Sequence, residues 1–191
     1  MYYKLGKIPP KRHIQFRKKD GSLYYEELFG NEGFSSDSSL IYHIHPPTQV
    51  SEVKGFKDVA PKAAIHENIT SRKIKANKIH SGSSYNEGKV PLLFNNDLTI
   101  GVSNPKSSSR EIYYKNVSLD ELIFIHKGNG LLKTFLGNIS FCDGDYLIIP
   151  RGIIYQIEFK SKKNKILYIE SNSPISLSES GAPSKNCPFL L

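Results

Sequence analysis

Short runs of branched aliphatic and aromatic residues recur along this chain, and glycine, asparagine, aspartate or proline closes most of them. The pattern is densest from Ser118 to Ile157, which reads SLDELIFIHKGNGLLKTFLGNISFCDGDYLIIPRGIIYQI. Runs of this kind, bounded by turn residues, are typical of antiparallel strands joined by tight turns. We therefore expect a series of consecutive β-strands in this part of the chain.

Similar runs flank this stretch on both sides. They cover residues 12–17 and 23–29 around a turn at 19–22, then 39–45, 90–95, 98–103, 111–117 and 165–171. The signal is weaker between residues 50 and 86, where we expect loops with room for one short strand. About a dozen short strands with almost no helix predict an all-β antiparallel barrel or sandwich.

The pattern predicts three regions. We expect residues 1–110 to form an extended N-terminal arm, in which Pro9 and Pro10 exclude helix, and strands that pack on the barrel. Residues 111–175 supply the core strands and belong to the same domain. Residues 176–191 are mostly serine, glycine, proline and charged residues, so their divergent composition predicts a disordered tail.

The composition suits one domain with a packed core, since 38% of the 191 residues are hydrophobic. No run approaches the roughly 18 apolar residues of a membrane helix, and the N-terminus has no apolar signal segment. The net charge of +8 comes from basic residues that occur singly or in short runs, without an aromatic and basic binding stripe. Two cysteines are too few for a disulfide framework, so we expect a cytoplasmic protein. The apolar and charge patterns predict no membrane and no nucleic-acid partner.

Residues in the densest stretch have the spacing of a known signature. Gly144 is followed after five residues by Pro150 and then by Gly152, which resembles the second sequence signature of the cupin barrels. In that signature a metal-binding histidine lies three positions after the second glycine. Tyr155 occupies this position here. The resemblance predicts a cupin-like jelly roll in which this ligand has been replaced.

The first cupin signature consists of two histidines separated by one residue, followed after three or four further residues by a glutamate. Glu121 is the candidate for this glutamate. The paired positions are then Lys115 and Val117, or Tyr114 and Asn116, and none of them is histidine. Iron and manganese sites of this type need several imidazoles and often a carboxylate. We therefore assign no metal ligand at these degenerate positions.

Two histidines form a weaker candidate site. His43 and His45 lie two residues apart on a predicted strand, which places both imidazoles on one face, where they could chelate a metal. No carboxylate follows at a suitable spacing, so a packing role is the simpler interpretation. Cys142 has Asp143 and Asp145 beside it, and their charges predict a raised thiol pKa and a poor nucleophile. We assign no catalytic residue.

Longer stretches resemble one enzyme family. They read KLGKIPPKRHIQFRKKDGSLYYEELFGNEGF, SSLIYHIHPPTQV, DELIFIHKGNGLLKTFLGNISFCDGDYLIIPRGIIYQIEF and YIESNSPI. In this order they are similar to the N-terminal region of homogentisate 1,2-dioxygenase, with a looser patch between Val50 and Val90. The resemblance stops after Ile175, where the sequence departs from the family pattern.

The resemblance implies an Fe(II) enzyme of tyrosine and phenylalanine catabolism that opens the ring of homogentisate with O2 to give maleylacetoacetate. In this family two histidines and a glutamate of the C-terminal half hold the iron. The family's subunits are two-part cupin-like β structures that form trimers, which pair into hexamers. Because the resemblance covers only the N-terminal half, no family iron ligand falls on this sequence.

We therefore expect the non-catalytic, cupin-like portion of a homogentisate 1,2-dioxygenase, which binds no Fe(II) and is inactive by itself. Its expected partners are the missing C-terminal half and, in the complete enzyme, further copies. A truncated gene, a frameshift or a fragment would each account for the length. Two alternatives stay open: a free-standing, metal-free cupin that acts as a binding or structural module, and an enzyme with a site built from His43, His45 and Glu121.

Overall fold

The computed structural model describes residues 15–30, 32–33, 35, 38–64, 68, 70–80, 82–106, 108 and 112–175. The expected arm at residues 1–11 and the expected tail at residues 176–191 lie outside the described residues. The chain separates into two compact units, residues 1–58 and residues 59–191. Each unit is described by itself.

Among the residues described in the first unit, β1 (Tyr25–Gly30) and β2 (Ser38–His43) form an antiparallel pair. Their register runs from Tyr25 opposite His43 to Gly30 opposite Ser38. The turn predicted at residues 19–22 is present, but the residues beside it form a single bridge between Arg17 and Leu23. The strand run predicted at residues 23–29 thus pairs mainly with the run that follows it, across residues 31–37.

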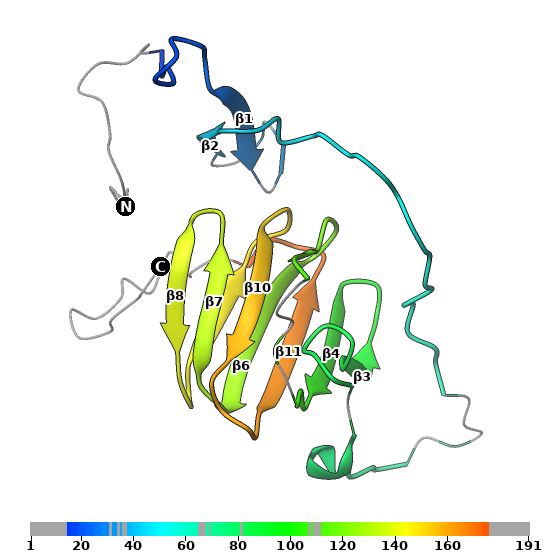
Figure 1. Cartoon of the computed structure of the whole chain (residues 1–191). Coiled ribbons are helices and arrows are strands. Elements are labelled where there is room, and N and C mark those ends of the chain that lie inside the picture. The colour runs from blue at the N-terminus through cyan, green and yellow to red at the C-terminus, as the bar shows by residue number, and fades with distance from the viewer. Residues whose placement is uncertain are drawn as a thin grey trace, which may run out of the picture. The chain divides into compact units, whose positions relative to one another are not determined.

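The described residues of the second unit form nine strands in two antiparallel sheets (Figure 1). The larger sheet has the order β3-β4-β11-β6-β9 and the smaller sheet the order β5-β10-β7-β8. The strands are β3 (Val90–Phe94), β4 (Leu98–Ser103), β5 (Tyr114–Lys115), β6 (Asp120–Lys127), β7 (Gly130–Thr134), β8 (Gly137–Phe141), β9 (Tyr146–Ile149), β10 (Ile154–Phe159) and β11 (Lys165–Ser171). A short 3-10 turn, η1 (Ala76–Lys78), is the helical element among the described residues.

The strand order identifies the fold. The chain crosses between the two sheets from β4 to β5, β5 to β6, β6 to β7, β8 to β9, β9 to β10 and β10 to β11. The sheets β4-β11-β6-β9 and β5-β10-β7-β8 are those of an eight-stranded jelly roll, the double Greek key fold that cupins share. β3 adds a further strand at the edge beside β4. The predicted all-β, cupin-like jelly roll is therefore confirmed.

The apolar residues that follow Gly130 in the densest stretch are divided between two strands. The residues from Leu131 to Gly137 lie on two strands, because the chain turns between Thr134 and Gly137. Gly137 has a φ of 135°, a backbone conformation that favours glycine. The Thr134 hydroxyl donates a hydrogen bond to the Gly137 carbonyl oxygen at 2.9 Å and so closes the turn. The FL pair between these residues therefore belongs to a turn and not to a strand.

The core lies between the two sheets. Alternate residues of each strand face inward, as the burial of Ile123 and Ile125 on β6 and of Tyr155 and Ile157 on β10 shows. Near one end of the core, buried Asp120 accepts hydrogen bonds from the Arg151 backbone N–H and side-chain Nε, at 3.0 and 2.9 Å. This ion pair ties the start of β6 to the turn between β9 and β10.

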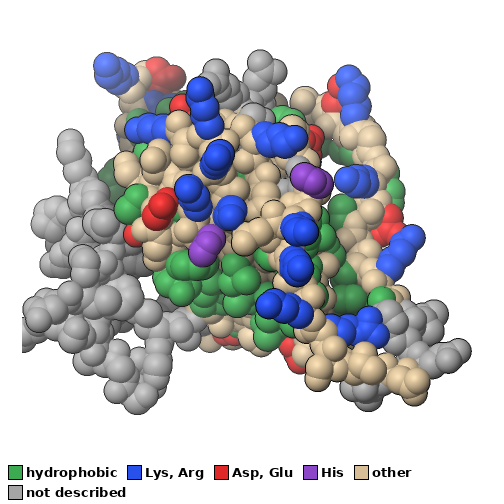
Figure 2. Space-filling model, turned by 90° about the horizontal axis from the view of Figure 1, so that it is seen from below, with side chains coloured by type: hydrophobic (Ala, Val, Ile, Leu, Met, Phe, Trp, Pro, Cys, Tyr) green, Lys and Arg blue, Asp and Glu red, His purple; other side chains and the backbone are tan. Residues whose placement is uncertain are grey.

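Basic side chains are spread out over one face of the described residues (Figure 2). Figure 2 shows lysine and arginine side chains dispersed over the face seen from below, with a group of adjoining hydrophobic side chains beside them. No helix in the described part of the chain is long and apolar enough to cross a membrane.

The jelly roll makes a direct prediction about stability. Ile123 is fully buried on a central strand, so Ile123→Ala should lower the free energy of unfolding by about 2–5 kcal/mol. Ile154 on β10 is 41% exposed, and Ile154→Ala should cost about 1 kcal/mol or less. Urea unfolding followed by circular dichroism measures both values. Equal losses in the two variants would contradict the assigned core.

Candidate functional site

Two glutamates face each other inside the jelly roll. Glu121 on β6 and Glu170 on β11 are register partners on neighbouring strands. The side chain of Glu121 is fully buried, and that of Glu170 is 15% exposed. Like charges directly opposite one another in a sheet destabilise it. A cation is therefore required between these carboxylates when both are ionised.

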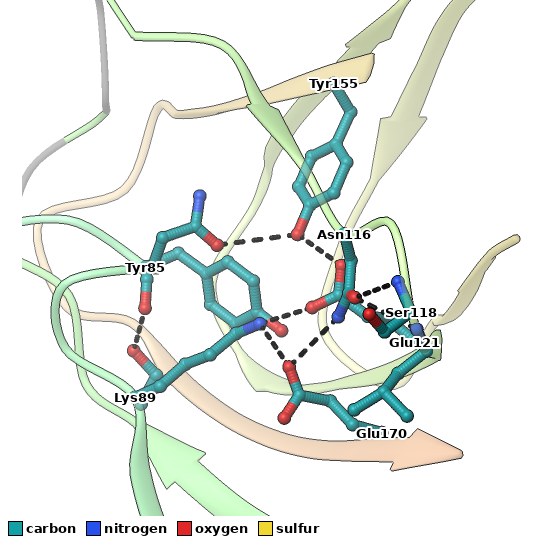
Figure 3. A network of polar contacts seen from close by, with 10 residues as sticks. Tyr85, Lys89, Asn116, Ser118, Glu121, Tyr155 and Glu170 are labelled. Atoms are coloured by element: carbon teal, nitrogen blue, oxygen red, sulfur yellow. Dashed lines mark hydrogen bonds and ion pairs between the residues drawn. The ribbon is translucent and has the colours of Figure 1, made fainter. Parts of the chain in front are cut away.

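Lys89 supplies this cation from the segment that precedes β3 (Figure 3). Its ammonium forms ion pairs with Glu121 and with Glu170 Oε1, the latter at 3.0 Å. Three tyrosine rings surround the ammonium, with ring centroids 5.0 Å (Tyr85), 5.1 Å (Tyr114) and 5.3 Å (Tyr168) from Nζ. Cation–π attraction at these distances adds to the ion pairs. Lys89 is thus held in a cage of two carboxylates and three aromatic rings.

Tyr155 completes the network from the smaller sheet. Its hydroxyl donates a hydrogen bond to Glu121 Oε2 at 2.8 Å. Tyr155 is the register partner of Tyr114 on β5, and their rings meet edge to face with centroids 5.5 Å apart. Asn116, just after β5, donates a hydrogen bond from Nδ2 to Glu170 Oε1 at 3.3 Å. The network therefore joins both sheets across the interior (Figure 3).

A glycine makes room for one ring of the cage. Gly101 on β4 is the register partner of Tyr168 on β11. A Cβ atom at Gly101 would lie 2.4 Å from the Tyr168 ring, a contact that no side chain tolerates. The absent side chain lets the Tyr168 ring lie close over β4.

The ionisation of Glu121 depends on Lys89. Burial raises the pKa of Glu121 above its ordinary value of 4.5, while the charge of Lys89 and the hydrogen bonds from Lys89 and Tyr155 offset part of this rise. Burial disfavours the charged form of Lys89, but the attraction of Tyr85, Glu121 and Glu170 outweighs it and raises the pKa of Lys89 well above 10.5. Lys89 is therefore a permanent cation at physiological pH.

The tyrosines of the cage stay protonated. Burial raises the pKa of Tyr85 and of Tyr155 well above 10, and it raises the pKa of Tyr168 to about 12. Neutral phenols can donate hydrogen bonds but are poor metal ligands. Tyr85 Oη is buried and has no hydrogen-bond partner.

These residues do not fit the Fe(II) site that the cupin resemblance suggests. Tyr114, Asn116, Glu121 and Tyr155, which correspond to the cupin signature positions, do converge in the interior, but they contribute no imidazole. Lys89 places an ammonium beside Glu121, and an ammonium donates hydrogen bonds and cannot coordinate a metal. Within the described ranges, no group of three His, Cys, Asp or Glu side chains could hold a metal ion.

The other candidate residues from the sequence, two histidines and a cysteine, do not belong to this network. His43 ends β2 in the first unit, and its Nε2 lies 2.6 Å from Glu27 Oε2 on β1. His45 follows the end of this strand and is exposed, whereas Glu121 belongs to the second unit. Cys142 is a free, exposed thiol. A hydrogen bond with Asp145, together with the charges of Asp145 and Asp143, raises the pKa of this thiol, as the sequence predicted.

Sequence reasoning missed Lys89 and Glu170. Lys89 lies at the border of the weakly patterned region, where no periodicity indicates which side chains point inward. Glu170 carried a readable signal, because it alternates with Ile166 and Tyr168 along one face of the run KILYIES. A carboxylate on the apolar face of a strand predicts a buried charge that needs a partner.

A curated relative matches most of the length of this chain. The chain is 35% identical over 168 residues to a protein of Saccharolobus solfataricus named "Putative dioxygenase". The match covers 88% of this chain and 43% of the relative, so the chain spans less than half the length of the curated relative it matches. No family model matches the sequence.

Solved structures with a similar arrangement include several cupins. A cupin-2 domain protein from Shewanella frigidimarina has a TM-score of 0.39 and 19% identity, over 44% of this chain and 79% of that one. The Cnp3 cupin domain of Schizosaccharomyces pombe has a TM-score of 0.42 and 15% identity, over 45% and 64%. A cupin protein from Bacteroides fragilis has a TM-score of 0.39 and 16% identity, over 56% and 98%. The assignment of the jelly roll stands on the strand order given above.

The cage predicts that loss of the Lys89 charge lowers the free energy of unfolding. Lys89→Met keeps the side-chain volume but leaves Glu121 buried without its cation, so the free energy of unfolding should fall by about 3–5 kcal/mol at neutral pH. Lys133→Met is the matched control, because Lys133 pairs with Glu158 at the surface and both side chains are about one-third exposed. The control should cost about 1 kcal/mol or less. Urea unfolding of both variants measures the difference.

The loss of unfolding free energy in Lys89→Met, relative to the wild type, should depend on pH. The folded state raises the pKa of Glu121 above 4.5. The contribution of Glu121 to the free energy of unfolding is therefore fully present below pH 4.5 and is lost as the pH rises through the folded-state pKa. Without Lys89 the pKa of Glu121 rises further. The variant should therefore be closer to wild-type stability at pH 5 than at pH 8, and Glu121→Gln in the Lys89→Met background should remove this dependence. A deficit that is constant between these pH values would contradict the assigned role of Lys89.

Proposed function

We propose that this jelly roll is a non-catalytic structural domain of a homogentisate-type dioxygenase. The observation that carries the proposal is the position of Lys89, whose ammonium pairs with Glu121 among the cupin signature residues. A barrel that contains its own cation can be stable without a metal. It then contributes shape and surface to an enzyme and not ring-opening chemistry.

The sequence relative supports the dioxygenase part of the proposal. It bears the name of a dioxygenase and aligns with 88% of this chain, which includes most of the jelly roll. Homogentisate is the finer part of the proposal and comes from the resemblance of the stretches quoted above. In a complete enzyme, a second half would supply the histidine and glutamate ligands for the Fe(II) cofactor.

The partners follow from the same proposal. The second half of the enzyme would pack against the jelly roll, and further copies would assemble with it into a trimer or hexamer. The jelly roll suits such a supporting role, because buried ion pairs at Lys89 and Asp120 fix its interior independently of any substrate. We expect the assembled protein to act in the cytoplasm.

Iron binding and oxygen consumption test this proposal. The purified chain should retain no stoichiometric iron after anaerobic incubation with Fe(II) and desalting, because Lys89 and protonated tyrosines occupy the interior. It should consume no oxygen on addition of homogentisate. Metal analysis and an oxygen electrode measure the two quantities, with a full-length homogentisate dioxygenase as the positive control.

The double variant His43→Ala/His45→Ala tests the remaining alternative, in which this chain is an enzyme with its own metal site. It should leave the iron content of the chain unchanged, because His43 contacts Glu27 in the first unit. One iron per wild-type chain that disappears in this variant would contradict the proposal, as would rapid oxygen uptake with formation of maleylacetoacetate.

One observation favours the second candidate, a metal-free cupin that binds a small molecule. Tyr85 Oη is buried without a hydrogen-bond partner and could bind a polar ligand. Under our proposal, homogentisate without metal should not raise the melting temperature more than phenylacetate, which lacks the two ring hydroxyls. A binding module with ligand at about 100 times its dissociation constant would gain about 2.7 kcal/mol. A homogentisate-specific shift that Tyr85→Phe abolishes would favour the binding module.

A further inference from the structure

The cage around the Lys89 ammonium has the composition of a binding site for an organic cation. It consists of two carboxylates and three aromatic rings, which belong to Glu121, Glu170, Tyr85, Tyr114 and Tyr168. The ring centroids lie 5.0 to 5.3 Å from Nζ, within the range of cation–π attraction. Proteins recognise ammonium ligands with aromatic cages and carboxylates of this kind. Here the ammonium that the cage holds is the end of a side chain of the same protein.

The two carboxylates are held in place by contacts that do not involve Lys89. Tyr155 donates a hydrogen bond to Glu121, and Asn116 donates one to Glu170. Both glutamates also belong to β6 and β11, which are paired along their length. The strands and these hydrogen bonds therefore keep both carboxylates directed into the cage when the lysine side chain is shortened.

The backbone on either side of Lys89 is anchored independently of its side chain. The Gly88 N–H donates a hydrogen bond to the Ser84 carbonyl oxygen at 3.0 Å, which closes a turn just before Lys89. The Ser103 hydroxyl of β4 donates a hydrogen bond to the Tyr85 carbonyl oxygen at 3.0 Å. β3 begins with the residue after Lys89 and pairs with β4. Shortening the side chain therefore empties the cage without releasing the segment.

One polar group of the cage is not used by Lys89. Tyr85 is 1% exposed, and its Oη has no hydrogen-bond partner among the described residues. In Figure 3 the Tyr85 ring lies beside the Lys89 ammonium, which donates hydrogen bonds to Glu121 and Glu170. A phenol oxygen can accept a hydrogen bond from an N–H group. A free ammonium ion has three N–H donors and no tether to the backbone, so it can direct one of them to this phenol.

We propose that the interior of the jelly roll is a binding site for primary alkylammonium ions, and that Lys89 fills it as the chain's own ligand. The two carboxylates select a cation over a neutral molecule. They also select N–H donors, so a primary ammonium is preferred to a quaternary one. The inference rests on the contacts of the cage and does not depend on the proposed dioxygenase function.

The cage also sets the size of the ligand. Lys89→Ala removes the side chain beyond Cβ, which corresponds to a propylammonium group. A free ligand lies at van der Waals distance from the remaining Cβ and not at a bond length, so the best ligand is one carbon shorter. Ethylammonium should therefore bind more tightly than butylammonium. The upper limit of binding free energy per atom for small ligands places its dissociation constant at about 1 mM or above.

Thermal unfolding of Lys89→Ala in about 100 mM ethylammonium chloride, against sodium chloride at the same concentration, tests the proposal. Ethylammonium should raise the melting temperature by about 5 °C more than sodium chloride does. Butylammonium, tetramethylammonium and ethanol should each give a smaller rise. The wild type should show no such difference, because Lys89 occupies the cage. Lys133→Ala is the matched control, because it removes a lysine that pairs with Glu158 at the surface, and it should also show none.

A second variant keeps the test decisive if Lys89→Ala does not fold. Lys89→Ala/Glu121→Gln also removes the buried, unpaired carboxylate, which is the main cost of losing the lysine. It retains Glu170 and the three rings, so ethylammonium should still stabilise it more than sodium chloride does. The further substitution Glu170→Gln should abolish this effect. Circular dichroism establishes whether each variant is folded.

Four outcomes would overturn the proposal. They are an equal shift with sodium chloride or ethanol, an equal shift in the wild type or in Lys133→Ala, tighter binding of butylammonium or tetramethylammonium, and failure of ethylammonium to stabilise or refold either variant of Lys89. Iron content and oxygen uptake are separate measurements, so the two proposals fail independently.

Discussion

Two carboxylates that oppose each other on neighbouring strands inside a barrel must share a cation, and this requirement organises the interior of the jelly roll. Glu121 and Glu170 cannot both be ionised in the core without a positive charge between them. Lys89 provides it from the segment before β3, and the tyrosine cage and Tyr155 fix the geometry. The ion pairs thereby tie β6, β11 and the segment before β3 to one another.

The same arrangement shows how the cupin signature positions can converge in the interior without the usual imidazole ligands. Tyr114, Asn116, Glu121 and Tyr155 converge as cupin signature positions do, so the framework of the site is intact. Its chemistry is different, because Lys89 is a cation that brings no coordination sites and the tyrosines keep their protons. Such a centre links the two sheets through the interior, and on this ground we propose a supporting role for the domain.

Much of the fold could be predicted from the sequence, because strand runs and turn residues are local signals. The predicted runs at residues 90–95, 98–103 and 165–171 lie on β3, β4 and β11, where the pattern placed them. The polar cage could not be predicted, since it depends on which residues become register partners across β6 and β11 and on the path of the loop that carries Lys89.

The central claim concerns the protonation state and surroundings of one side chain, and nuclear magnetic resonance of the lysine ammonium groups, labelled with nitrogen-15, tests it most directly. A caged Lys89 ammonium exchanges its protons slowly with water and gives a resolved signal that persists as pH rises past 10.5, since its pKa is raised well above that value. The signal must vanish in Lys89→Met. Lysine signals that all titrate together near 10.5 would contradict the account.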